Sequence, residues 1–118
     1  MNRKEIGAAG EQIAAKALSR SGLKILERNV RRSTGEIDII AREKKTYVFV
    51  EVKARSCDRY GRPVEAVDHR KQQRILRTAT LWLSEKGLSD EPVRFDVVEI
   101  LPGETRHLKN AFDASALY

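Results

Sequence analysis

The sequence is poor in the residues that build disulfide-stabilised, fibrous or membrane-spanning proteins. It has one cysteine, Cys57, and three prolines in 118 residues. A single cysteine excludes an intrachain disulfide and a zinc site built from several cysteines, as expected in a reducing compartment. Residues 1–18 include basic side chains but no continuous apolar stretch, so neither a signal peptide nor a membrane span is expected there. We therefore expect a cytoplasmic protein that does not associate with membranes.

The composition is that of a globular protein. Hydrophobic residues make up 41% of the chain and charged residues 34%, with seven glycines and no visible internal repeat. These proportions lie outside those of disordered and low-complexity chains. A chain of this length is expected to form one domain, residues 1–118, around one hydrophobic core.

Basic residues outnumber acidic ones, and the excess is regional. The net charge is +6, but residues 1–87 hold 20 Lys and Arg against 11 Asp and Glu, whereas residues 88–118 hold 3 against 6. A concentrated positive field favours a polyanionic partner such as nucleic acid. A basic globular protein without such a partner is equally compatible with charge alone.

The apolar spacing predicts two helices and four strands. Residues 4–20 and 68–87 carry apolar side chains three and four positions apart, which is typical of amphipathic helices. Asp68 is a suitable N-cap for the second helix, and Gly87 is a suitable stop. No element is assigned to residues 104–118. The expected strands cover residues 23–30, residues 93–101 and the two halves of residues 35–55.

The segment GEIDIIAREKKTYVFVEVKAR, residues 35–55, is predicted to form a hairpin with charges inside its strands. Side chains two apart share a face of a strand. One face is therefore expected to be apolar and to lie against the helices, while the other carries the charges. With the turn in the middle, Asp38 lies opposite Glu51. By the same register, Glu36 lies opposite Lys53. The expected apolar face comprises Ile37, Ile39, Ala41, Val48, Val50 and Val52.

Two facing carboxylates destabilise a strand pair, so a cation is expected between Asp38 and Glu51. Lys53 alone would leave the pair one charge short. Mg²⁺ (or Mn²⁺) would balance both, because Mg²⁺ binds through one or two carboxylates and keeps waters and phosphate oxygens in its shell. Such a metal would polarise a phosphodiester, and Lys53 would hold or deprotonate the attacking water. The alternative is an ion-pair cluster on a half-exposed sheet.

Five motifs together resemble the YraN-like family of small bacterial proteins, over about residues 7–112. That family is functionally uncharacterised, and it is similar to Holliday junction resolvases and to other nucleases of the restriction-endonuclease-like superfamily. The motifs are G-E-x-x-A-x-x-x-L at residues 10–18, G-E-I-D at 35–38, V-F-V-E-V-K-A-R at 48–55, K-x-x-R at 71–74 and R-F-D-V-V at 94–98.

The resemblance implies an α/β fold with an αβββαβ core, in which helices flank a mixed central sheet. This order of elements matches the one that the apolar pattern predicts. In such nucleases, an Asp of the second strand and a Glu-any-Lys of the third form the active site, often with a Glu from the first helix. By position these are Asp38, Glu51, Lys53 and Glu11. The resemblance also implies a metal contact from the Val52 carbonyl. Ile37 stands where the broader motif has a proline, which is neither an acid, a base nor a ligand.

Basic residues around this constellation are candidates for binding nucleic acid. Arg55 shares a strand face with Glu51 and Lys53 and is suited to hold the scissile phosphate. Lys71 lies on the core side of its helix and is expected to reach toward the sheet. Without a nucleic-acid partner, most of these side chains would be solvated. The further candidates to follow a phosphate backbone are Arg31, Arg32, Arg59, Arg62, Arg70, Arg74 and Arg77, together with Lys71.

These features predict a Mg²⁺-dependent endonuclease acting on DNA, with branched or recombination-intermediate DNA as candidate substrates and a homodimer as a candidate assembly. One alternative is a nucleic-acid-binding protein of the same fold that does not cut, since fold alone does not establish turnover. A third reading, a scaffold protein without nucleic acid, predicts no salt-sensitive DNA binding.

Overall fold

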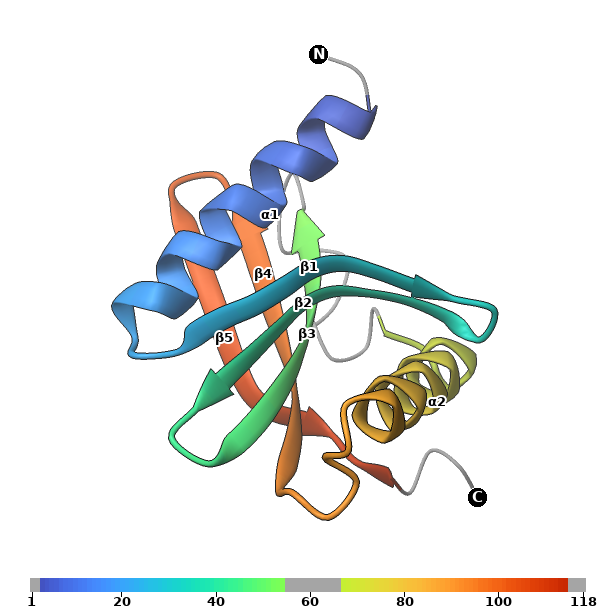
Figure 1. Cartoon of the computed structure of the whole chain (residues 1–118). Coiled ribbons are helices and arrows are strands. Elements are labelled where there is room, and N and C mark those ends of the chain that lie inside the picture. Colours follow the sequence, from blue (N-terminus) through green and yellow to red (C-terminus); the bar gives the residue numbers. More distant parts are fainter. Residues whose placement is uncertain (1–2, 55–66, 115–118) are drawn as a thin grey trace.

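The computed structural model describes residues 3–54 and 67–114, with side chains from residue 9 onward. Two helices and five strands make up this part of the chain (Figure 1). The predicted α/β class and αβββαβ order are confirmed, and one further strand follows. No helix in the described residues is long and apolar enough to cross a bilayer. The elements are α1 (Arg3–Arg20), β1 (Lys24–Arg32), β2 (Gly35–Glu43), β3 (Thr46–Ala54), α2 (His69–Glu85), β4 (Val93–Leu101) and β5 (Glu104–Phe112).

The strands form one mixed sheet in the order β1-β2-β3-β4-β5. Neighbouring strands are antiparallel except β3 and β4, which are parallel. A parallel pair needs a crossover connection, and α2 lies in the connection between these two strands. The side chain of Asp68 accepts a hydrogen bond from the Lys71 backbone N–H at 2.9 Å, which confirms Asp68 as the N-cap of α2.

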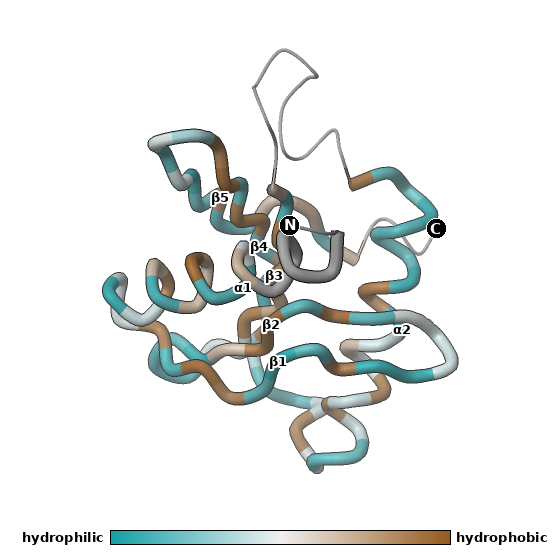
Figure 2. The backbone as a smooth tube through the Cα atoms, turned by 90° about the horizontal axis from the view of Figure 1, so that it is seen from above, coloured by the Kyte–Doolittle hydropathy of each residue, from teal (hydrophilic) through white to brown (hydrophobic). Residues whose placement is uncertain are grey.

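The two helices cover opposite faces of the sheet (Figure 2). On one face, Leu18 of α1 packs in a core with Ile39 and Val50. On the other face, Phe49 contacts the ring of Trp82 from α2 edge-on, with the ring centroids 5.9 Å apart. The predicted apolar face is confirmed for Ile39, Ala41, Val48, Val50 and Val52, which share the core under α1, but the expectation that the opposite face carries only charges is wrong, because Ile40 and Phe49 are buried there under α2. Strands that are covered on both faces carry nearly continuous apolar runs.

The side-chain alternation of β2 is interrupted at Asp38. Ile37 belongs to the core under α2, whereas Ile39 belongs to the core under α1, so the prediction that the two share a face is wrong. At the same level of the neighbouring strand β1, Asn29 has a left-handed backbone with φ 53°. An irregularity of this kind redirects the side chains beside it. Asp38 thus lies where β2 changes from one core to the other.

The predicted register of the hairpin is confirmed from its turn up to Ile39, which pairs with Val50. Beyond that pair, the Asp38 carboxylate accepts a hydrogen bond from the Val52 backbone N–H at 2.8 Å. A carbonyl of β2 would accept this bond if the ladder continued. The ladder therefore ends at Ile39, and neither predicted pairing beyond it, of Asp38 with Glu51 or of Glu36 with Lys53, is part of it.

Residues 104–112, to which the sequence pattern assigns no element, form β5 at the edge of the sheet. Asp96 of β4 is fully buried and anchors this strand. Its carboxylate accepts hydrogen bonds from Arg94 Nε and from the Asn110 backbone N–H, both at 2.9 Å, and lies 2.7 Å from His107 Nε2. Burial acts to raise the pKa of Asp96, but these hydrogen bonds outweigh it and hold the pKa below its ordinary value.

Candidate functional site

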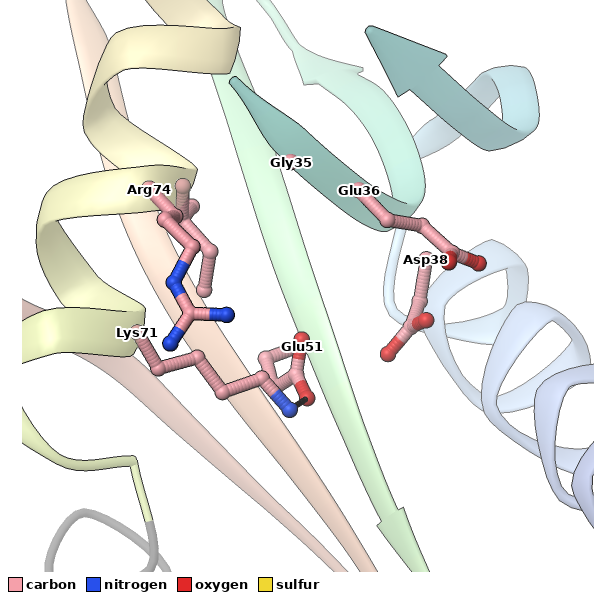
Figure 3. Close-up of a pocket in the computed structure, with 7 residues that line it drawn as sticks. Gly35, Glu36, Asp38, Glu51, Lys71 and Arg74 are labelled. Carbon is pink, nitrogen blue, oxygen red and sulfur yellow. Dashed lines mark ion pairs between the residues drawn. The ribbon is translucent and has the colours of Figure 1, made fainter. Parts of the chain in front are cut away.

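A pocket lies where β2 and β3 diverge, next to α2 (Figure 3). It brings together residues from three elements that are far apart in the sequence. Glu36 and Asp38 come from β2, Glu51 comes from β3, and Lys71 and Arg74 come from α2. The lining residues are Gly35, Glu36, Asp38, Glu51, Lys71, Arg74 and Ile75.

Gly35 allows α2 to approach the start of β2. Its φ is 150°, and a Cβ atom at this position would lie 3.1 Å from Arg74 Cβ and 3.3 Å from Thr78 Oγ1. The backbone conformation therefore favours glycine, and a Cβ would also require the neighbouring atoms of α2 to shift by a few tenths of an ångström. The hydroxyls of Thr34 and Thr78, 2.7 Å apart, form a hydrogen bond at the same junction. This close approach places the basic side chains of α2 in the wall of the pocket.

Asp38 is a carboxylate that the fold makes difficult to ionise. Its pKa is raised from 3.8 to about 7, first by burial and then by the negative charge of Glu51. The hydrogen bond from the Val52 N–H favours the ionised form, whereas the charge of Glu11 opposes it. The pocket thus holds a carboxylate pair whose mutual repulsion a cation would relieve.

Glu51 is almost enclosed, with 5% of its surface exposed. The Lys71 ammonium forms an ion pair with Glu51 Oε1 (Figure 3). Lys53 Nζ lies 3.8 Å from the same oxygen. Two ammonium groups, one from α2 and one from β3, therefore converge on a single carboxylate oxygen.

The two lysines differ in how firmly they hold their protons. Burial and the neighbouring Lys71 lower the pKa of Lys53, although Glu51 and Asp38 act in the opposite direction. Burial also acts to lower the pKa of Lys71, but the hydrogen bond to Glu51 and its negative charge outweigh this and raise it. Lys71 therefore stays charged, whereas Lys53 is better suited to exchange a proton with a water.

Comparison with known proteins identifies the family. The profile of the uncharacterised protein family UPF0102 matches residues 10–100. The chain belongs to this family. A UPF0102 protein of Symbiobacterium thermophilum is 49% identical over 116 residues, covering 94% of this chain and 98% of its own. A UPF0102 protein of Clostridioides difficile is 44% identical, with coverages of 95% and 100%, and one of Nocardia farcinica is 45% identical, with coverages of 94% and 91%. The expected resemblance to a functionally uncharacterised family is confirmed.

The UPF0102 pocket offers two carboxylates as metal ligands. Among the described residues, no group of three His, Cys, Asp or Glu side chains is placed to hold a metal ion. Zinc takes three or four protein ligands, whereas Mg²⁺ binds through one or two carboxylates and keeps several waters. Asp38 and Glu51 therefore fit Mg²⁺ or Mn²⁺, and relief of their repulsion favours that fit. Val52 adjoins them through its N–H, and a metal contact from its carbonyl stays a prediction.

Glu11 of α1 influences this site through its negative charge. Its charge contributes to raising the pKa of Asp38. One carboxylate oxygen of Glu11 lies 3.8 Å from Arg28 Nη2, and Arg28 Nη1 donates a hydrogen bond of 2.8 Å to Gln12. Glu11 is thus held against β1 near Asp38, and its catalytic role stays a prediction.

The predicted nucleic-acid contacts of this UPF0102 protein fall into two groups. Arg31 lies 3.5 Å from Glu36, and Arg32 donates hydrogen bonds to both carboxylate oxygens of Glu85. These two guanidinium groups already have acidic partners. Arg74 lines the pocket and is exposed, and no ion pair joins it to another described residue. Arg74 is therefore the one of the three best placed to bind a phosphate.

Arg70 and Arg77 flank Arg74 on α2, and all three are exposed. Side chains three or four residues apart lie on one face of a helix, so the three arginines form a basic stripe that passes the pocket. The predicted contacts that fall outside the described residues are Arg55, Arg59 and Arg62.

Some functional features of this pocket could not be found from the sequence. The prediction that Lys71 reaches toward the sheet is confirmed by its ion pair with Glu51, but the sequence did not identify Glu51 as its partner, and its contact with DNA stays a prediction. The available signal was its position, one turn before the buried Ile75 and thus on the core side of its helix. The G-E-I-D motif gives no sign that Gly35 is needed for close packing, because that need arises from a helix more than thirty residues away.

Proposed function

We propose that this UPF0102 protein is a divalent-metal-dependent endonuclease that hydrolyses phosphodiester bonds in DNA. The observation that carries the proposal is the convergence of Asp38 and Glu51 from two diverging strands, with the Lys53 ammonium 3.8 Å from Glu51. Groups whose pKa values are strongly shifted by burial and by one another cluster at functional sites. Branched and recombination-intermediate DNA are the candidate substrates.

Each charged group has a distinct role in this proposal. Asp38 and Glu51 would hold Mg²⁺ or Mn²⁺, which supplies polarisation of the phosphate and a bound water of lowered pKa. Lys53 orients the attacking water and exchanges a proton with it, as its lowered pKa favours. In its charged form, Lys53 also stabilises the negative charge that develops on the phosphate. Arg74, on the opposite wall, binds a neighbouring phosphate.

DNA is the partner that the charge distribution favours. The positive excess lies in residues 1–87, the part of the chain that contains the pocket and the arginine stripe of α2. Contacts from such a stripe to phosphates position a nucleic acid without reading its sequence. We also propose that the protein acts as a homodimer that cuts two strands. A cytoplasmic location, expected from the single cysteine, is part of this proposal.

The test is incubation of the purified protein with four-way, flapped and linear DNA in Mg²⁺ or Mn²⁺. Cleavage is expected to require the metal and to be lost in Asp38→Ala and Glu51→Gln. Arg32→Ala, at a guanidinium paired away from the pocket, is the matched control and keeps cleavage. Cleavage that survives Asp38→Ala would point to a contaminant. Absence of cleavage on all three substrates contradicts the proposal.

One observation favours a second candidate function, a nucleic-acid-binding protein that does not cut. Lys71 already neutralises Glu51, and Asp38 is readily protonated, so the pocket is close to charge balance by itself. In that case the carboxylates stabilise the fold, and the arginines of α2 bind the nucleic acid. DNA binding that is unchanged by EDTA and by Glu51→Gln, with no cleavage, would identify this function.

A further inference from the structure

Glu51 forms an ion pair with Lys71, which is not one of the residues predicted to bind the metal. The Lys71 ammonium contacts Oε1 of Glu51 more closely than Lys53 does. A carboxylate as enclosed as Glu51 cannot rely on water, so it needs such a partner. Lys71 therefore occupies Oε1, one of the two oxygens through which Glu51 can bind a cation.

The backbone of Lys71 is held in place, whereas its side chain is partly exposed. Its backbone N–H is held by the Asp68 cap in the first turn of α2. Its side chain is 37% exposed, so part of it is open to solvent. A flexible four-carbon stem carries a compact charge. Lys71 can thus leave Glu51 by side-chain rotation, without movement of the helix.

We propose that Lys71 is an exchangeable counter-ion: it neutralises Glu51 in the metal-free protein, leaves when a divalent cation binds to Asp38 and Glu51, and then binds a phosphate of the DNA. The inference rests on the proposed function, because it requires that metal site. An ammonium and a divalent cation cannot share one carboxylate oxygen without strong repulsion. The exchange keeps the enclosed Glu51 paired in both states.

The released ammonium has a suitable second position beside Arg74. The two side chains lie three residues apart on α2 and line the same wall of the pocket (Figure 3). Arg74 has no ion-pair partner among the described residues, so a phosphate there would meet two cations. Metal binding and DNA binding are then positively coupled through Lys71, and by linkage each strengthens the other equally.

The experiment is calorimetric titration of the DNA-free protein with Mn²⁺ at pH 8. Lys71→Met is expected to bind Mn²⁺ about tenfold more tightly than wild type, because the metal no longer competes with the ammonium. Arg74→Met removes a positive charge from the same wall without touching Glu51, and it is expected to change the affinity by about twofold or less. Asp38→Asn is expected to lose binding.

Circular dichroism and thermal unfolding establish that each variant is folded. Lys71→Gln, which keeps a hydrogen-bond donor for Glu51 without the charge, replaces Lys71→Met if the latter does not fold, with the same expected gain in affinity. A second readout is the rise in the thermal midpoint on adding Mn²⁺, which is expected to be larger in the Lys71 variant than in wild type.

The outcomes separate this inference from the proposed function. If wild type binds Mn²⁺ through Asp38 but the Lys71 variants bind it no more tightly, the exchange is overturned and the metal site stands. Equal gains in the Lys71 and Arg74 variants overturn it as well, because they show a general effect of charge. If neither wild type nor the Lys71 variants bind Mn²⁺, both proposals fall.

Discussion

Replacement of Asp38 by asparagine is expected to stabilise the metal-free protein at pH 8. Asparagine keeps an oxygen to accept the Val52 N–H and removes the charge that burial and Glu51 oppose. The pKa of Asp38 is about 7 in the folded protein, against an ordinary value of 3.8. Between these values the folded state binds a proton that the unfolded state has lost, so stability falls as pH rises. About three pH units correspond to roughly 4 kcal/mol, which is the upper limit of the gain.

Urea unfolding in EDTA, followed by circular dichroism at pH 5 and pH 8, measures this effect. Wild type is expected to lose stability relative to Asp38→Asn between the two pH values, so that the variant is clearly the more stable protein only at pH 8. Asp90→Asn, at an exposed carboxylate, is the matched control and should follow wild type. An Asp38→Asn variant less stable than wild type at pH 8, or a difference that is independent of pH, would refute the reasoning.

Gly35→Ala is expected to lower the free energy of unfolding by about 1–3 kcal/mol, whereas Gly22→Ala, which would meet no atom within 4 Å, should lose less in the same urea experiment. Asp96→Asn weakens a fully buried charge network and should cost about 3 kcal/mol, seen as a lower thermal midpoint. Arg74→Ala should weaken DNA binding and reduce its salt slope by about one in fluorescence anisotropy, while the ion-paired Arg32→Ala changes little. Equal losses of stability in Gly35→Ala and Gly22→Ala, or equal effects of Arg74→Ala and Arg32→Ala on DNA binding, would contradict these expectations. An unchanged thermal midpoint in Asp96→Asn would do so as well.

The order of the elements could be predicted because it depends on short-range patterns. The N-cap at Asp68 and the apolar spacing that follows it specify α2 within a few residues. The tight turn of the hairpin fixes its register near the turn, where Ile40 lies opposite Phe49. β5 could not be predicted in this way, because most of its side chains are polar and its position depends on long-range bonds to Asp96.

The carboxylates of the site could be predicted because Asp38 and Glu51 interrupt strands that are otherwise apolar. The surroundings of these carboxylates could not be predicted from the sequence. The change of face between Ile37 and Ile39 accompanies an irregular residue on another strand, and the partner of Glu51 depends on where α2 packs. Local patterns therefore locate the acidic groups, while tertiary packing decides which charges they meet.

Anomalous diffraction from a crystal soaked in Mn²⁺ tests most directly whether Asp38 and Glu51 form a metal centre. The expected result is one peak between the two carboxylates, with ligand oxygens at about 2.1 Å and with the Lys71 ammonium withdrawn from Glu51. A saturating soak that gives no peak between them, with Lys71 still paired to Glu51, would contradict the account.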